Sequence, residues 1–228
     1  MRRRWGQHFL RDASVAEFIA GQIPHGVDML EVGPGRGALT LPLARRARLL
    51  YVIEVDRRLA EALRRGVPPN VVVIEGDALK VPWPKVDYFV SNMPYSITSP
   101  LLMRLVEYRL PAVITVQKEV AERLAAGPGS PNYGRLTVAV RCHYEVETLR
   151  HLPPTVFTPP PKVWSTAIRL TPKAPCVEEF QEFQKFTAWL FSHRRKTLRR
   201  LKLADTERRV FQLTLEEIVS LYKTRRHL

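Results

Sequence analysis

Four residues with the chemistry of an amine-binding site, Asn92-Met93-Pro94-Tyr95, follow an apolar run from 86 to 91. Such a run is typical of a strand buried on both faces, and it brings its last residues to the ligand-binding edge of an open α/β sheet. The side-chain oxygen of Asn92 and the carbonyl of Met93 can accept the two hydrogens of an exocyclic amino group, while Tyr95 stacks on the ring. The motif therefore suits a planar aromatic amine, although Asn and Pro are also common in simple strand-ending turns.

A glycine-rich turn precedes this motif in the chain. A predicted strand at 27–32 runs into Gly33-Pro34-Gly35-Arg36-Gly37, and a helical stretch follows at 38–47. Glycines let the backbone approach a ligand where a Cβ would clash. The third glycine comes one place too early for a dinucleotide fingerprint. The acidic Glu31, two places before the first glycine, instead resembles the first motif of S-adenosylmethionine (SAM) methyltransferases; a purely structural turn is the alternative.

Two acidic residues stand at the ends of the next predicted strands, 49–54 and 71–75. Glu54 follows Gly33 by about twenty residues, a spacing at which a carboxylate accepts hydrogen bonds from ribose hydroxyls in nucleotide-binding folds. Asp77 can accept from the exocyclic amine of an adenine. Glycine, Glu and Asp at successive strand ends predict a nucleoside-binding site next to Asn92.

Further elements complete an α/β pattern. An acid or serine at 12–14 can cap a first helix, strand 112–116 leads into helix 118–126, and 164–170 alternates like a final strand. The periodicity of 133–152 does not separate helix from strand. Phe157 lies in a proline-dense stretch, 153–161, which is either a stiff connector or the support for a second face of a base-stacking slot.

The charge balance favours a polyanionic partner. The formal net charge is +14, and a large positive charge promotes binding to nucleic acid through counterion release; a basic proteome or a thermophile's surface is the alternative.

The composition changes near 171–175, where we place a domain boundary, and helices are expected at 178–192 and 215–222. We expect two clusters of cations, one near each end of the chain, to contact RNA. The second cluster is expected on a helix, and the alternative is that this helix face is only solvated. The cations are Arg2, Arg3, Arg4, Arg194, Arg195, Lys196, Arg199 and Arg200.

Other classes of protein are disfavoured. Cys142 and Cys176 match no metal-ligand spacing and do not suggest a disulfide framework, so we expect no metal and a reducing, cytoplasmic setting. No apolar run is long enough to span a bilayer, and polar residues interrupt the apolar region that a signal peptide would need after Arg2-Arg3-Arg4.

Several motifs together resemble the family of ribosomal RNA small-subunit adenine dimethyltransferases, which is related to the erythromycin-resistance rRNA methyltransferases. The chain looks like an archaeal member, and the resemblance covers roughly 4 to 201. Its motifs are Gly6-Gln7-His8-Phe9-Leu10, Glu31-Val32-Gly33-Pro34-Gly35, Asn92-Met93-Pro94-Tyr95, Gln117-Lys118-Glu119-Val120, Tyr133-Gly134-Arg135-Leu136, Phe157-Thr158-Pro159-Pro160-Pro161-Lys162-Val163 and Arg194-Arg195-Lys196-Thr197-Leu198.

The resemblance implies a Rossmann-like SAM-dependent methyltransferase fold of class α/β, with a seven-stranded sheet in residues 1–172 and a small all-helical RNA-binding domain in 173–228. It implies SAM as methyl donor and dimethylation on N6 of two adjacent adenosines near the 3′ end of small-subunit rRNA, by a monomer acting on the immature subunit. The implied catalytic residues are Asn92, Met93, Pro94, Tyr95 and Phe157, and the implied cofactor-binding residues are His8, Leu10, Gly33, Gly35, Glu54, Asp77 and Asn92. Position 8 is usually Asn in bacterial members and is His here; Met93 replaces the usual Leu.

Two alternatives stay open from the sequence. One is an N6-adenine methyltransferase that acts on large-subunit rRNA or on DNA. The other is an RNA-binding ribosome-assembly factor in which catalysis is secondary. Intact Gly33, Glu54, Asp77 and Asn92 favour a working enzyme but permit both roles.

Overall fold

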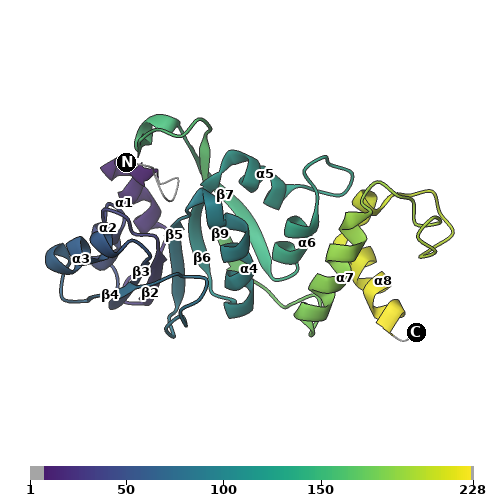
Figure 1. The fold of residues 1–228 in the computed structure, drawn as a ribbon, viewed down its shortest axis with the longest axis horizontal. Coiled ribbons are helices and arrows are strands. Elements are labelled where there is room, and N and C mark those ends of the chain that lie inside the picture. Colours follow the sequence, from purple (N-terminus) through teal and green to yellow (C-terminus); the bar gives the residue numbers. More distant parts are fainter. Residues whose placement is uncertain (1–7, 227–228) are drawn as a thin grey trace. The chain divides into compact units, whose positions relative to one another are not determined.

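The computed structural model describes residues 8–226, and its centre is a seven-stranded sheet in the order β4-β3-β2-β5-β6-β9-β7 (Figure 1). The strands are β2 (Asp28–Val32), β3 (Leu49–Glu54), β4 (Val71–Glu75), β5 (Tyr88–Asn92), β6 (Ala112–Gln117), β7 (Tyr144–Leu152) and β9 (Ser165–Pro172). The first five strands in this order run parallel to one another, and β9 runs antiparallel to β6. The chain order reverses between β2 and β5, which is the topological switch point where open α/β sheets bind ligands.

Eight α-helices accompany the strands in residues 8–226, most of them in the crossovers that a parallel sheet requires. They are α1 (Ala13–Gly21), α2 (Thr40–Ala44), α3 (Arg57–Gly66), α4 (Thr98–Tyr108), α5 (Lys118–Ala125), α6 (Arg135–Arg141), α7 (Phe180–Ser192) and α8 (Leu215–Arg226). The carboxylate of Asp12 caps α1 as expected, accepting from the amides of Ser14 at 2.9 Å and Val15 at 3.2 Å.

Both faces of the sheet are covered by apolar side chains. On one face, Val90 of β5 belongs to a buried cluster with Val15 and Ile19 of α1. Successive strand residues point to opposite faces, so the neighbouring Phe89 lies on the other face, where it stacks on Trp83 at a centroid distance of 5.0 Å. Burial on both sides explains why the strand before Asn92 is a continuous apolar run.

The chain divides into two compact units. One contains the described residues up to Lys118 and Glu147–Thr171, and the other contains Glu119–Val146 and the chain from Pro172 onward. Within the second unit, α7 packs beside α8 and also contacts α6 (Figure 1). The second unit thus includes α6 as well as the C-terminal helices, and the division of the chain at 172/173 stays a prediction.

Most expected elements lie where the sequence places them. The predicted strands 49–54 and 71–75 coincide with β3 and β4, and the ambiguous 133–152 contains α6 followed by β7. The basic segment 193–202 was expected to be helical, and this is wrong because it consists of turns and one isolated β-bridge. Among residues 8–226, no helix has the length and apolar character needed to cross a membrane.

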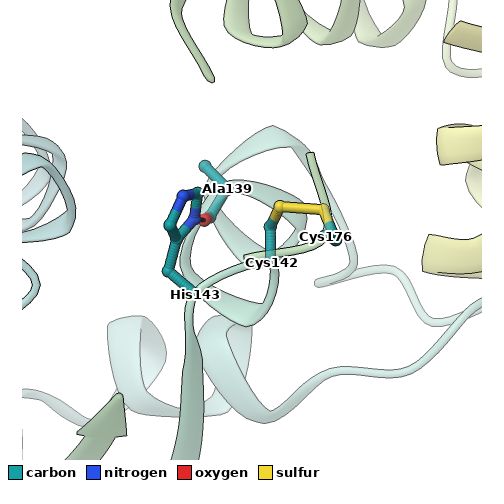
Figure 2. Close-up of a disulfide and its surroundings, with 4 residues drawn as sticks. All are labelled: Ala139, Cys142, His143 and Cys176. Carbon is teal, nitrogen blue, oxygen red and sulfur yellow. Dashed lines mark hydrogen bonds between the residues drawn. A yellow bond between two sulfur atoms is a disulfide. The ribbon is translucent and has the colours of Figure 1, made fainter. Parts of the chain in front are cut away.

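The two cysteines form a disulfide, which corrects the expectation of free thiols. Cys142 directly follows α6, Cys176 precedes α7, and their Cα atoms are 5.0 Å apart (Figure 2). The backbone beside the bridge is also paired, since the amide of Cys176 donates to the carbonyl of Cys142 at 3.0 Å. The bridge therefore ties two segments of the second unit that are 34 residues apart in sequence.

Candidate active site

One cavity opens at the carboxyl ends of β2, β3 and β5, at the switch point of the sheet. Its lining includes every predicted cofactor-binding residue and the whole Asn-Met-Pro-Tyr motif: His8, Leu10, Gly33, Gly35, Glu54, Asp77, Asn92, Met93, Pro94 and Tyr95. Residues from five separate stretches of sequence thus meet in one place.

The glycine turn after β2 has little room for a side chain at Gly33 and none at Gly35. Gly33 and Gly35 have φ of +72° and +57°, in the region that favours glycine. A Cβ on Gly35 would lie 2.6 Å from the ring of Phe9, and one on Gly33 would lie 3.2 Å from Pro94. Glycine is therefore needed both for the conformation and for the close approach of β1 (Phe9–Leu10) to the turn.

Glu54 is a buried carboxylate at the end of β3, with 2% of its surface exposed. One carboxylate oxygen accepts from the amide of Gly35 at 3.0 Å and the other from the amide of Asp56 at 2.9 Å. Burial raises the pKa of Glu54, and these amide bonds act in the opposite direction. A carboxylate can accept about four hydrogen bonds, so each oxygen can accept a further donor. This is the acceptor set that a ribose diol requires.

Asp77 lies in the loop after β4 and is partly exposed. One of its oxygens accepts from the amide of Leu79 at 2.9 Å, which fixes the carboxylate at the cavity wall. The other oxygen is 3.8 Å from the ammonium of Lys80. An exocyclic amine in the cavity would find an acceptor here, as the sequence predicts.

Glu31 of β2 is a second buried carboxylate in the cavity lining. It accepts from the hydroxyl of Thr40 at 2.7 Å. Burial raises its pKa to about 8, and the nearby charge of Glu54 contributes in the same direction. The sequence marked Glu31 as a motif residue, but its raised pKa is a consequence of packing that only the structure reveals.

Asn92 is the last residue of β5, and its side-chain orientation is fixed by a main-chain contact. Its amide nitrogen donates to the carbonyl of His8 at 3.2 Å. Because an amide has one donor end and one acceptor end, this contact leaves the side-chain oxygen of Asn92 as the group that can accept. The amide of Met93 donates to the carbonyl of Thr115 at 3.0 Å, which holds the following turn against β6.

His8 connects three segments around the cavity. Its Nδ1 lies 2.7 Å from the carbonyl of Pro159, and since a carbonyl only accepts, Nδ1 is the donor. Its ring packs on Tyr95 at a centroid distance of 5.4 Å. His8 therefore supports both Asn92 and Tyr95, a role that the sequence did not suggest, in addition to lining the predicted cofactor site.

Phe157 does not face the cavity, so its predicted role as a second stacking face is not supported. It is 1% exposed and belongs to the apolar core cluster with Leu10. In the backbone, β8 (Phe157–Thr158) pairs with β1, with Leu10 opposite Phe157. An aromatic residue in a proline-dense stretch can either pack or bind; here it anchors the N-terminal strand to the core.

The predicted RNA-binding cations have different environments. Arg194 donates to the carbonyls of Ser130, Pro131 and Tyr133 at 3.3, 2.9 and 3.0 Å, so its guanidinium holds a loop of its own unit. Arg199 pairs with two nearby acids. The exposed cations that remain in this cluster are Arg195, Lys196 and Arg200. Arg2, Arg3 and Arg4 lie outside the described residues.

In residues 8–226, no group of three or more His, Cys, Asp or Glu side chains could hold a metal ion.

Comparisons with known proteins identify the family of this chain. The family model for ribosomal RNA adenine dimethylase matches residues 1–221. A relative from Pyrobaculum islandicum, named probable ribosomal RNA small subunit methyltransferase A, is 70% identical over 97% of this chain and 94% of its own. The crystal structure of a dimethyladenosine transferase from Plasmodium falciparum superimposes with a TM-score of 0.86 at 29% identity, covering 96% of this chain and 98% of that one. The crystal structure of the 23S rRNA methyltransferase ErmE superimposes with a TM-score of 0.73 at 28% identity, covering 94% of this chain and 98% of that one. The chain belongs to the ribosomal RNA adenine dimethylase family.

Proposed function

We propose that this protein transfers methyl groups from SAM to N6 of two adjacent adenosines near the 3′ end of small-subunit rRNA, twice on each. The observation that carries the proposal is the orientation of Asn92. Its amide nitrogen donates to the carbonyl of His8, which leaves its oxygen to accept, and Asn92 lines the same cavity as Glu54 and Asp77. The names of the relatives, which specify the small ribosomal subunit, support the choice of RNA.

The residues of the cavity fit SAM. The free acceptor positions of Glu54 suit the ribose hydroxyls, and Asp77 suits the adenine amine. The glycine turn brings backbone rather than side chains to the ligand, since a Cβ at Gly35 would already clash. When bound, SAM supplies an activated methyl group on a positively charged sulfur.

The motif residues act on the target nitrogen. The lone pair of adenine N6 is delocalised into the ring, which makes it a poor nucleophile at rest. Acceptance of its two hydrogens by Asn92 and the carbonyl of Met93 favours a more tetrahedral nitrogen, with its lone pair directed at the methyl group. Tyr95 stacks on the extruded base, a contact worth about 1–3 kcal/mol. The alkylated nitrogen then loses its proton to water, so catalysis rests on proximity and preorganised hydrogen bonds.

Affinity for the RNA comes from the basic surface. A net charge of +14 provides long-range attraction, and the exposed Arg195, Lys196 and Arg200 provide phosphate contacts, together with Arg2–Arg4 at the N-terminus. The proposal includes action on the immature small subunit, as a monomer, in the cytoplasm.

The deciding experiment is mass spectrometry of rRNA after incubation of unmethylated small subunits with the protein and SAM. The expected product is a pair of N6,N6-dimethyladenosines in the 3′ region. Parallel reactions with large-subunit rRNA and duplex DNA test the alternatives, and methylation of either in place of small subunits would overturn the assignment. Failure of the protein to bind SAM in calorimetry would favour an assembly factor without catalysis.

A further inference from the structure

Ser165 makes one side-chain contact at the edge of the active site. Its Oγ lies 2.6 Å from the hydroxyl of Tyr95, across 70 residues of sequence. Ser165 itself is 0% exposed. None of the chemistry described above uses Ser165, and it does not line the cavity.

The backbone of Ser165 is held firmly by the sheet. It is the first residue of β9, opposite Gln117 of β6 in the antiparallel pairing. The preceding carbonyl, that of Trp164, accepts from the amide of Lys118 at 2.9 Å, which extends the same pairing by one step. Ser165 is therefore fixed relative to β6, and β6 in turn pairs with β5, the strand that precedes Tyr95. Its hydroxyl is a fixed point for the side chain of Tyr95.

Tyr95 needs such a fixed point. It lies in a short 3₁₀ turn, Tyr95–Ile97, after β5, and its side chain is only partly buried. The ring of His8 contacts its ring at 5.4 Å, but a ring contact alone leaves the far end of the side chain free to swing. A hydrogen bond at the hydroxyl, opposite the ring's attachment, removes that freedom and fixes the position of the stacking face.

The hydroxyls of Tyr95 and Ser165 satisfy each other's need for a hydrogen-bond partner. A buried hydroxyl without a partner costs free energy, and each of these two hydroxyls supplies the other with one. Burial also raises the pKa of Tyr95, so the phenol stays protonated at neutral pH.

We infer that Ser165 is a positioning residue that sets the stacking face of Tyr95 against the target adenine. The inference deepens the proposed function and rests on it for the identity of the stacked base. It treats the Tyr95 hydroxyl as a means of holding the ring, with no part in the transfer itself.

A double-mutant cycle tests this role. Loss of one hydrogen bond is worth about 0.5–1.5 kcal/mol, and about 1.4 kcal/mol is a tenfold change in rate. Ser165→Ala and Tyr95→Phe should therefore each lower kcat for adenosine methylation by about two- to twelvefold, with the KM for SAM unchanged. The double variant should lose no more than either single variant, because both remove the same bond. If the two losses multiply, or if Ser165→Ala leaves kcat unchanged, the inference is overturned.

A matched control lies next to Ser165 on the same strand. Thr166 is equally buried, and its hydroxyl contacts Nδ1 of His151 at 3.0 Å, not the active site. Thr166→Val should leave kcat as in the wild type. A loss equal to that of Ser165→Ala would show that any lost hydroxyl on this strand has the same effect, and would overturn the inference.

A measurement without RNA separates this inference from the proposed function. In protein labelled with ¹³C at the tyrosine Cζ, the signal that is missing in Tyr95→Phe identifies Tyr95. That signal should shift in Ser165→Ala and stay in place in Thr166→Val. A signal unmoved by Ser165→Ala would refute the contact whether or not the enzyme is active, whereas a wild type that fails to methylate small subunits would refute the proposed function alone.

Discussion

The side-chain amide of Asn92 donates to the main-chain carbonyl of His8 at 3.2 Å, across 84 residues of sequence. This contact joins the residue just before β1 to the last residue of β5. It also engages the amide nitrogen of Asn92 as a donor, so the side-chain oxygen is the group left to accept a hydrogen bond. An exocyclic amine has hydrogens to donate, and this oxygen can accept one of them.

Replacement of Asn92 should abolish most of the turnover without loss of cofactor. In Asn92→Ala the target nitrogen loses one of its two acceptors, and removal of one such group in other active sites costs about 10²–10³ in kcat. SAM affinity should change much less, because Asn92 is one of seven predicted cofactor-binding residues and the other six, Glu54 and Asp77 among them, are untouched. Turnover on small subunits and SAM binding by calorimetry check this together; normal turnover would exclude Asn92 from the mechanism.

Glu54 should determine cofactor affinity. Both of its oxygens already accept from backbone amides, so Glu54→Gln puts an amide nitrogen against one of those donors and weakens the bonds to the ribose. Hydrogen bonds to charged groups are worth about 1.5–3 kcal/mol, which corresponds to roughly 10- to 100-fold weaker SAM binding. Glu75, opposite Glu54 on β4 and 38% exposed, is the matched control: Glu75→Gln should bind SAM normally, and equal weakening in both variants would contradict the assignment.

The residues that the sequence predicted to lie together, and that line one cavity, share one physical reason. Gly33, Glu54 and Asp77 stand at or just after the ends of strands predicted to be parallel, and the carboxyl ends of parallel strands meet at one edge of a sheet. Recognition of the strands was therefore enough to bring these residues together. The family expected from the motifs is confirmed by the match over 1–221, and the expected fold by the similar solved structures.

The contacts that the sequence did not reveal depend on packing between distant segments. No local pattern pairs Ser165 with Tyr95 or turns Arg194 toward loop carbonyls. Phe157 carries the same apolar ring whether it stacks on a base or packs in the core, and only its pairing with β1 decides. Two cysteines 34 residues apart likewise carry no signal of pairing until α6 and the segment before α7 are placed side by side.

Glu31 should make stability depend on pH. Its pKa rises from 4.5 in the unfolded chain to about 8 in the folded protein. The folded state therefore holds a proton that the unfolded state releases between these values, so the free energy of unfolding should fall as pH rises across this window, by at most about 1.4 kcal/mol per pH unit. Denaturant unfolding at pH 5 and pH 8 should show a smaller difference in Glu31→Gln than in the wild type. An equal difference in both would assign the effect to other groups, among them Glu54.

Two arginines of the basic segment should have opposite phenotypes. A single terminal nitrogen of Arg194, Nη2, donates to three loop carbonyls, so Arg194→Ala, which removes this donor, should lower the free energy of unfolding by about 1–3 kcal/mol. Arg200 is exposed, so Arg200→Ala should leave stability unchanged and weaken RNA binding. Its slope of log affinity against log salt should become shallower by about 0.7 if the contacted RNA is single-stranded. Binding titrations at several salt concentrations, with unfolding curves, check both; the reverse pattern would contradict the structure.

The disulfide should stabilise the second unit without affecting the cofactor site. Closing a loop of 34 residues limits the unfolded chain, and bridges of this kind contribute about 2–4 kcal/mol. Cys142→Ser combined with Cys176→Ser should lower the free energy of unfolding by that amount, and dithiothreitol should lower the stability of the wild type but not of the variant. SAM affinity should be the same in both proteins, because every cavity residue belongs to the other unit. Detection of two free thiols in the denatured, unreduced wild type would show that the bridge does not form.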